Sequence, residues 1–162
     1  MQLRPLAESD VEEVVALSLR AWAPVFASFE AVLGPAVYRH LFPDWSTSQA
    51  DAVRHVCRDD ALRRWVADDG ARPVGFVAVA LHDEAHGEPS SGEIEMIAVD
   101  PTAQRRGTGA RLIEVALEDM RRAGRQLAVI GTGGDPGHAP ARRAYERAGF
   151  RPLPQVRYYR ML

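Results

Sequence analysis

The sequence contains no lysine and only one cysteine. All 20 basic residues are arginine. Every contact made by a permanently charged, cationic side chain is therefore made by a guanidinium, a group that suits bidentate phosphate binding. The single cysteine excludes an intrachain disulfide and a cysteine-rich zinc site. Because Cys57 lies in the helix-like stretch 52-AVRHVCRDD-60, we expect a buried apolar thiol there and not a nucleophile.

Long apolar runs and an excess of one charge are missing as well. No window is expected to approach the roughly 20 apolar residues of a membrane span, and the N-terminus lacks a signal-peptide pattern. The formal net charge of -2 leaves no general basic surface for a phosphate backbone. We therefore expect a cytoplasmic protein with no membrane and no nucleic-acid partner. No repeat or linker divides the 162 residues, which predicts a single domain over residues 1–162.

Hydrophobic periodicity predicts an α/β domain, in the α+β sense, in which helices flank a mixed sheet. Strands are expected at residues 2–6, 62–69, 74–83, 93–100 and 126–133, followed by two closing strands at 150–154 and 156–162. Helices are expected from the capping box Ser9–Glu12 to interruptions at Pro24 and Gly34, and then over residues 36–42, 46–60, 107–123 and 140–148. Pro5 favours an edge position for the first strand. The strand–helix–strand order of residues 93–133 predicts a parallel pair joined by a right-handed crossover.

Two arginines and two glycines separate the strand ending in Asp-Pro from the next helix, in 104-QRRGTGARLIEVAL-117. Gly107 and Gly109 have no side chains, so an anion can approach the unpaired N–H groups of the first helical turn, aided by the helix dipole. Arg105 and Arg106 add mobile positive charge. The pattern therefore predicts a pyrophosphate site as well as a turn.

Other phosphate-binding patterns do not fit this stretch. A Walker loop needs a lysine, and a dinucleotide fingerprint needs a third glycine where this chain has Leu112. The stretch does resemble the acetyl-CoA signature of GNAT-superfamily N-acetyltransferases, Q/R-x-x-G-x-G/A, which Gln104, Gly107 and Gly109 satisfy.

Two further segments strengthen the resemblance to this family. The strand 96-MIAVDP-101 resembles the family's fourth strand, and 141-ARRAYERAGF-150 resembles its A-x-x-x-Y-x-x-x-G-F helix and turn. The resemblance implies a GNAT-like fold with a central mixed, mostly antiparallel sheet and a parallel, splayed strand pair. It further implies an acetyl-CoA-binding core at residues 93–150 and a variable, acceptor-side region at residues 1–60.

The same resemblance implies which residues contact acetyl-CoA, the expected cosubstrate. The fourth strand contributes backbone groups, with a backbone N–H near Ile97 or Ala98 polarising the thioester carbonyl. Many relatives have an asparagine where this chain has His138, so the polar contact made at that position is left open. The implied set is Ile97, Ala98, Val99, Gln104, Arg105, Arg106, Gly107, Thr108, Gly109, Ala110, His138 and Arg142.

Acetyl transfer to an amine needs a base for the ammonium proton and an acid for the departing thiolate. Glu93 and Glu95 are the candidate bases, and by their spacing both are expected on one strand face with Ile97 and Val99. Solvated carboxylates at a strand start are the alternative for each. By resemblance, Tyr145 is the candidate general acid; an amphipathic-helix core tyrosine is the alternative.

Histidines and aromatic residues offer two other groupings. His82 and His86 have a metal-like spacing but lie in a polar segment, so we expect surface histidines and no metal site. Aromatic side chains between residues 22 and 45 either line an acceptor pocket or pack into the core, and helical spacing favours packing for at least half of them.

Together these patterns predict an acetyl-CoA-dependent N-acetyltransferase that acts by direct attack in a ternary complex. The acceptor is a primary amine of a small molecule or peptide that the sequence does not identify. The alternative is a non-catalytic module of the same fold that binds or senses acyl-CoA. Homodimerisation fits the resemblance, because many relatives dimerise.

Overall fold

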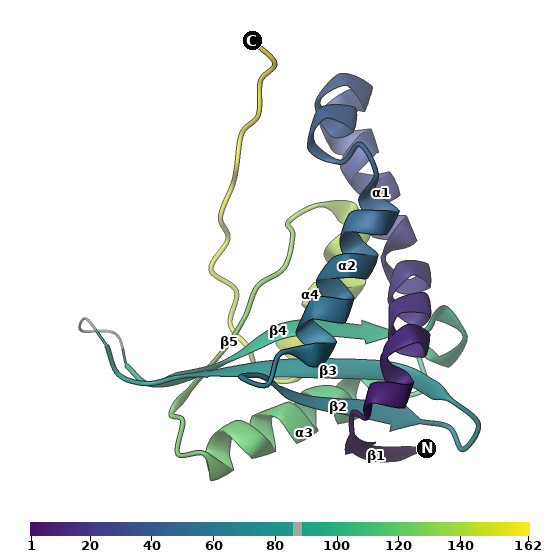
Figure 1. The fold of residues 1–162 in the computed structure, drawn as a ribbon. Coiled ribbons are helices and arrows are strands. Elements are labelled where there is room, and N and C mark those ends of the chain that lie inside the picture. Colours follow the sequence, from purple (N-terminus) through teal and green to yellow (C-terminus); the bar gives the residue numbers. More distant parts are fainter. Residues whose placement is uncertain (86–88) are drawn as a thin grey trace.

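A five-stranded mixed sheet lies between two layers of helices in the computed structural model, which describes residues 1–85 and 89–162 (Figure 1). The strand order is β1-β2-β3-β4-β5, with antiparallel pairing from β1 to β4 and parallel pairing of β4 with β5. The predicted mixed, mostly antiparallel sheet is therefore confirmed, with β1 at an edge. The strands are β1 Gln2–Pro5, β2 Arg63–Asp68, β3 Pro73–His82, β4 Ser91–Val99 and β5 Leu127–Ile130.

Helices cover both faces of this sheet. α1 and α2 form a hairpin over one face, α3 covers the other, and α4 lies on the α1 side, where the turn before it contacts α1 (Figure 1). Short 3-10 turns precede three of the helices. The helices and turns are η1 Glu8–Asp10, α1 Val11–Leu41, α2 Trp45–Arg58, η2 Pro101–Ala103, α3 Thr108–Arg122, η3 Pro136–His138 and α4 Ala139–Arg147.

The start of α1 differs from the predicted capping box. The residue preceding the helix is Asp10, whose carboxylate accepts a hydrogen bond from the Ala7 backbone N–H at 2.8 Å. Ser9 lies inside the 3-10 turn, and Glu12 accepts from Arg54 on α2 at 2.9 Å. The aspartate therefore replaces the serine as the group that organises this helix start.

Only one of the two predicted interruptions breaks α1. The helix continues through Pro24, whereas Gly34 has φ 75° and ψ 157°, outside the helical region, and divides α1 into two segments. A positive φ of this kind is readily adopted by glycine alone, so the kink follows from the residue type. The next helix is capped by Asp44, which accepts from the Thr47 N–H at 3.2 Å.

One helical stretch, Glu8–Leu41, is long and apolar enough to cross a membrane by length and composition, contrary to the sequence prediction. Its first turns belong to the core: Val11, Val14 and Leu17 are 1% exposed or less and pack toward the sheet. The burial of these side chains is that of a core helix.

Two hydrophobic clusters, one on each sheet face, hold the layers together. The first joins α1 and α2 to the sheet and includes Leu17, Val53 and Phe76. The second joins α3 to the sheet and includes Leu112 and Met120. Each fully buried aliphatic or aromatic side chain contributes about 1.5–3 kcal/mol by its transfer from water.

The two closing strands predicted at 150–154 and 156–162 are wrong. Residues 151–162 form neither strand nor helix, and every one of them is exposed. Their composition is typical of a strand, but within this chain they pair with nothing that would make one. Figure 1 shows this segment as an extended yellow trace that leaves the sheet.

Candidate active site

β4 and β5 pair over only half the length of β4. The parallel register runs from Ser91 opposite Leu127 to Ile94 opposite Ile130, where β5 ends. From Glu95 to Val99 the edge of β4 that faces away from β3 therefore has no strand partner among the residues that the structure describes. This open edge offers backbone N–H and C=O groups to an extended ligand.

A β-bulge at Glu95 changes which way the β4 side chains point. Met96 pairs with Ala78, but Ile94 pairs with Val79, so Glu95 is the extra residue. Consequently the prediction that Glu93 and Glu95 share a face with Ile97 and Val99 is wrong. Ile97 and Val99 pack in the α3-side cluster. Bulges commonly re-aim side chains next to functional sites.

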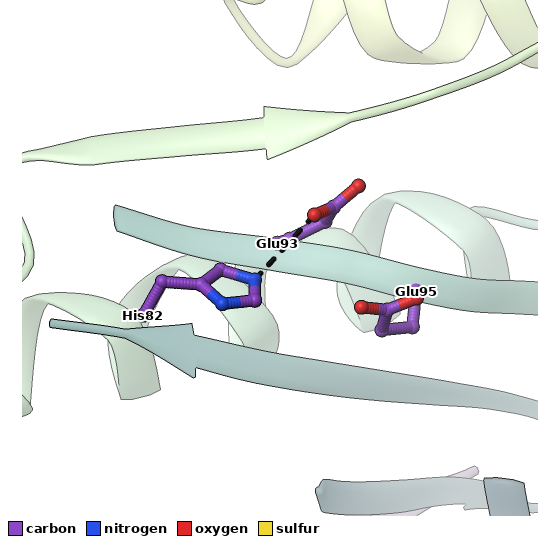
Figure 2. Close-up of side chains that lie close together, drawn as sticks. All are labelled: His82, Glu93 and Glu95. Atoms are coloured by element: carbon purple, nitrogen blue, oxygen red, sulfur yellow. Dashed lines mark ion pairs between the residues drawn. The ribbon is translucent and has the colours of Figure 1, made fainter. Parts of the chain in front are cut away.

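Glu93 points to the face covered by α1 and α2, because its neighbours Gly92 and Ile94 both face α3. On that face the imidazole Nε2 of His82, at the end of β3, lies 3.5 Å from the Glu93 carboxylate (Figure 2). One ligand atom from each of His82, Glu93 and Glu95 lies within 4.8 Å of the others. The structure therefore brings both predicted bases close to His82, which was expected to be a surface histidine without a role in the site.

His82 is nevertheless reachable from solvent. Its side chain is 49% exposed and that of Glu93 is 38% exposed. The other histidine of the predicted pair, His86, lies outside the described residues. An imidazole next to a half-exposed carboxylate suits proton exchange with water.

The loop between β4 and α3 has the features of an anion site. Arg105 has φ 58° and Gly107 has φ 82°, both left-handed, and left-handed residues are a component of the backbone nests that bind anions. Gly107 also precedes the first turn of α3, and an added Cβ there would meet nothing within 4 Å. Residues 104–107 are exposed. The free N–H groups at this helix start are thus open to a ligand.

Side chains on either side of Gly107 hold this loop in shape. The Gln104 amide donates to the Val99 carbonyl at 3.0 Å, and the buried Thr108 hydroxyl donates to the Ala103 carbonyl at 3.0 Å. Gln104 and Thr108 are therefore placed as supports of the loop backbone. Their predicted contact with the cosubstrate stays a prediction.

Asp100 anchors the beginning of the loop. Its carboxylate is 1% exposed and accepts from the Thr102 hydroxyl at 2.6 Å, from Arg20 at 2.6 Å and from Arg72 at 3.2 Å. Burial alone raises the pKa of this carboxyl, but the hydrogen bonds from Thr102, Arg20 and Arg72 outweigh it and hold the pKa well below its usual range. The negative charge therefore persists at every physiological pH and ties α1 to the loop.

A second buried aspartate ties α1 to the segment before α4. Asp135 accepts from the Ser28 hydroxyl of α1 at 2.6 Å and from the Gly137 N–H at 3.0 Å, and it also contacts Nδ1 of His138. Burial opposes its ionisation, but Ser28, His138 and Gly137 lower the pKa of Asp135 below its usual value. His138 stands at the position where many relatives have asparagine. One of its ring nitrogens, Nδ1, already contacts Asp135.

Arg142 supports the loop before α4. Its Nη1 atom donates to the carbonyls of Gly133 at 2.6 Å and Asp135 at 2.8 Å. This places the guanidinium against the backbone after β5, on the side where β4 and β5 separate. Whether the remaining N–H groups of Arg142 meet a phosphate stays a prediction.

Tyr145 is half-buried on α4, with its ring edge toward Phe150 at a centroid distance of 6.3 Å. Burial raises the pKa of its phenol to about 12. The hydroxyl is thus a proton donor that stays protonated over the whole neutral range. Cys57, by contrast, is 2% exposed in the α1–α2 core, and burial raises the pKa of its thiol to about 11.

The aromatic cluster is structural for the most part. Phe26 is 8% exposed and stacks on Trp45 at 4.4 Å, while Phe29 stacks on Phe42 at 5.5 Å. These contacts close the tip of the α1–α2 hairpin. Phe29 reaches the site region, with its ring 5.5 Å from that of His138.

Sequence reasoning missed three contributors: His82, Asp100 and Asp135. Both aspartates are followed by proline, and both cap a 3-10 turn with their side chains. An Asp-Pro pair at a strand end is a turn signal that marks such anchors. His82 had no local signal, because it meets Glu93 only through the pairing of β3 with β4.

The parallel pair of β4 and β5 thus opens beside the helix start at Gly107. Residues 29–150 match the model of the acetyltransferase (GNAT) family. The chain belongs to this family of acyl-transferring enzymes, as the sequence resemblance predicted.

Individual relatives agree with this assignment. The chain is 30% identical over 156 residues to a mycothiol acetyltransferase from Rhodococcus opacus, covering 91% of this chain and 50% of the relative. It therefore spans about half the length of the curated relatives it matches. A variant of the BH1408 protein from Bacillus halodurans has a similar structure, with a TM-score of 0.76 at 16% identity and complete coverage of both chains. The aminoglycoside acetyltransferase AAC(6')-Iy, solved with a bisubstrate analogue of CoA, gives a TM-score of 0.66 at 19% identity, covering 99% of this chain and 97% of that one.

Proposed function

We propose that this chain transfers an acetyl group from acetyl-CoA to a primary amine of a small molecule or peptide, by direct attack within a ternary complex. The observation that carries the proposal is the continuity of the open β4 edge, from Glu95 to Val99, with the anion-binding loop at Gly107. An extended arm bearing a pyrophosphate fits such an edge and loop together. The bisubstrate complex of AAC(6')-Iy supports this reading, since that protein binds a CoA derivative.

Different residues of this chain would bind different parts of acetyl-CoA. The N–H groups at the start of α3 would hold the pyrophosphate, with Arg105 and Arg106 as exposed cations beside it. Backbone groups of Ile97, Ala98 and Val99 would align the pantetheine arm and polarise the acyl carbonyl. Acetyl-CoA, when bound, supplies the thioester. The small residues Gly109, which is half-buried, and Ala110, which is exposed, leave the helix start uncrowded.

Proton transfer would be carried out by groups on three elements, β3, β4 and α4. Glu93 would accept the proton of the attacking ammonium, with Glu95 as the neighbouring carboxylate at the bulge and His82 passing the proton to water. Tyr145 would donate to the departing thiolate from α4. Cys57 lies on α2 and is 2% exposed within the core on the α1–α2 face of the sheet, so an acetyl-cysteine intermediate finds no support.

Binding of acetyl-CoA is the first expectation to measure. Replacing Gly107 and Gly109 together by glutamate should raise the Kd for acetyl-CoA about 100-fold, equivalent to about 2.7 kcal/mol. Two carboxylates would face the pyrophosphate, and Gly107 would carry a side chain at φ 82°. Isothermal titration calorimetry with acetyl-CoA and with CoA measures the effect.

The matched control is Gly124→Glu at the opposite end of α3. Gly124 also has a positive φ, 75°, and open space around it, so this variant has the same kind of backbone strain without a charge at the loop. Wild-type affinity in the control and loss in the double variant support the proposal. Absence of acetyl-CoA binding by the wild-type protein would refute it, and binding without turnover of any amine would favour the sensing module.

A double-mutant cycle tests the pairing of His82 with Glu93. We expect Glu93→Gln to lower kcat about 100-fold and His82→Gln about tenfold, the former within the usual range of general base catalysis. Because the two groups act as a unit, His82→Gln should have little further effect in the Glu93→Gln background. Steady-state kinetics should show an unchanged KM for acetyl-CoA. Full additivity of the two losses, or an equal loss in the exposed control His55→Gln, would contradict this role.

The named activities of the relatives support a small-molecule acceptor. Mycothiol acetyltransferases and aminoglycoside acetyltransferases are named for small molecules. Asp68 pairs with Arg4 at 2.6 Å, and Asp69 caps the β2–β3 turn. Glu93 and Glu95 would supply negative charge beside the proposed acceptor.

A further inference from the structure

His82, Glu93 and Glu95 form a group of metal-ligating side chains at the end of β3 and in the first half of β4. Figure 2 shows the three side chains close together, with the imidazole of His82 beside the Glu93 carboxylate. One ligand atom from each residue lies within 4.8 Å of the others. We call these three residues the His-Glu-Glu cluster. An imidazole nitrogen and carboxylate oxygens are ligands that Zn²⁺ takes from proteins.

The separation of two of these ligand atoms already suits a single ion. Nε2 of His82 lies 3.5 Å from a carboxylate oxygen of Glu93. Two ligands bound to one tetrahedral Zn²⁺ at about 2.0–2.2 Å each lie roughly 3.3–3.6 Å apart. Glu95 lies exposed at the bulge, so a change of rotamer can bring its carboxylate to a third position. Three protein ligands leave the fourth position to water, as in catalytic zinc sites.

No arginine neutralises the two carboxylates. Among the residues that the structure describes, Glu93 forms an ion pair with His82 alone, and Glu95 forms none. The buried Asp100, by contrast, pairs with two arginines. Two carboxylates this close repel each other, and a bound cation relieves that repulsion.

The surrounding strands hold the cluster in place before any ion binds. Arg125, whose side chain is 16% exposed, donates from Nη1 to the His82 carbonyl at 3.1 Å and to Asp83 at 2.6 Å. These contacts fix the end of β3. Glu93 stands opposite Ala80 in the β3–β4 pairing, so the residue across from it carries only a methyl group. Outer contacts that fix the ligands in this way raise the affinity for a metal.

We propose that the His-Glu-Glu cluster binds Zn²⁺ and that the bound ion inhibits acetyl transfer. The side chains of His82 and Glu93 are 49% and 38% exposed, so the ion enters directly from solvent. The inhibition rests on the proposed function, because the ion takes the carboxylate lone pairs that would otherwise accept the ammonium proton. The ion is thus an inhibitor and not a cofactor. The expectation of no metal site came from the spacing of His82 and His86 along the chain, which does not show the two glutamates.

Calorimetry with the metal alone tests the site. The protein, produced without a histidine tag and stripped of metal with EDTA, is titrated with Zn²⁺ in chelator-free buffer. His82→Gln and Glu95→Gln should each raise the Kd for Zn²⁺ at least about 100-fold, since loss of an outer contact alone costs up to about 100-fold. Both side chains are exposed, so the variants retain the fold, which circular dichroism checks.

Two controls accompany this titration. His55→Gln removes another exposed histidine, from α2, and should leave the Kd for Zn²⁺ unchanged. Mg²⁺ should give no measurable binding to the wild-type protein, because it prefers oxygen ligands and keeps most of its water.

Zinc inhibition of acetyl transfer tests the second half of the proposal. Zn²⁺ should inhibit the wild-type enzyme at a half-maximal concentration close to the Kd from calorimetry, and EDTA should reverse the effect. The residual activity of His82→Gln should need at least about 100-fold more Zn²⁺ for the same inhibition. An acceptor without a thiol is used, and initial rates at low conversion keep the released CoA thiol from competing for the ion.

Each outcome decides the proposal. Absence of Zn²⁺ binding by the wild-type protein, or binding that survives both His82→Gln and Glu95→Gln, overturns the site. Zn²⁺ binding at the cluster with no effect on an active enzyme overturns the inhibition. A protein that binds Zn²⁺ at the cluster but neither binds acetyl-CoA nor acetylates an amine refutes the proposed function and with it the inhibition, while the site stands.

Discussion

Replacing Tyr145 by phenylalanine should lower kcat for acetyl transfer about 100-fold to 1,000-fold, within the usual range for general acid catalysis. Burial raises the pKa of this phenol to about 12, so its hydroxyl is protonated at all neutral pH values. The loss should therefore be a constant factor between about pH 6 and about pH 9, a window well below that pKa. Stopped-time assays of CoA release across this range measure it.

The raised pKa also defines what Tyr145 does. A phenol with a pKa of about 12 does not protonate a free thiolate outright. We expect it to donate a hydrogen bond that becomes a proton transfer as the C–S bond breaks. Tyr38→Phe removes a hydroxyl from the α1 tip and is the matched control. Equal kcat values for Tyr145→Phe and wild type would assign Tyr145 to the core alone.

Asp100→Asn should lower the free energy of unfolding by about 3 kcal/mol at neutral pH. The change removes a buried charge that accepts from Arg20, Arg72 and Thr102, and hydrogen bonds to charged groups contribute about 1.5–3 kcal/mol each. The expected loss is smaller than the sum, because both arginines are more than a third exposed and regain water. Urea unfolding followed by circular dichroism measures it.

The pH dependence of this difference follows from the depressed pKa of Asp100. A folded-state pKa below the unfolded value of about 3.9 adds stability that is complete above that value and is lost as the pH falls toward the folded pKa. The difference in the free energy of unfolding between Asp100→Asn and wild type should therefore become smaller below about pH 4. Asp51 forms an exposed ion pair with Arg54. Asp51→Asn should therefore lower the free energy of unfolding by at most about 1 kcal/mol. An equal cost for the two variants would contradict the anchoring role of Asp100.

The sheet and the loop before α3 could be predicted from the sequence because their signals are local, while phosphate binding by this loop stays a prediction. Strand alternation, the Asp-Pro boundary and the spacing of Gly107 and Gly109 all depend on neighbours along the chain. The predicted parallel pair, the α3 helix and the open edge of β4 follow from these signals and the family resemblance. The predicted contacts of individual residues with acetyl-CoA remain predictions.

What the sequence did not reveal depends on contacts between distant segments. Glu95 forms a bulge because β4 has one more residue than β3 between two neighbouring strand pairs. The sequence of one strand does not show such a mismatch. His82 met Glu93 through the same pairing. Pro24 was read as an interruption, but packing of α1 against the sheet outweighed the local preference. Residues 151–162 were predicted to form two strands because their composition is typical of a strand, but in the structure they pair with no strand of the sheet.

The early end of β5 also bears on how tightly a ligand binds. Because no strand within the described residues pairs with Glu95–Val99 on that edge, an extended ligand gains backbone hydrogen bonds there without displacing a strand, although the Val99 carbonyl already accepts from Gln104. The free-energy cost of leaving this β4 edge unpaired is offset when the chain folds, chiefly by the hydrophobic clusters on both faces of the sheet. Such preorganisation leaves more of the interaction free energy to appear as affinity.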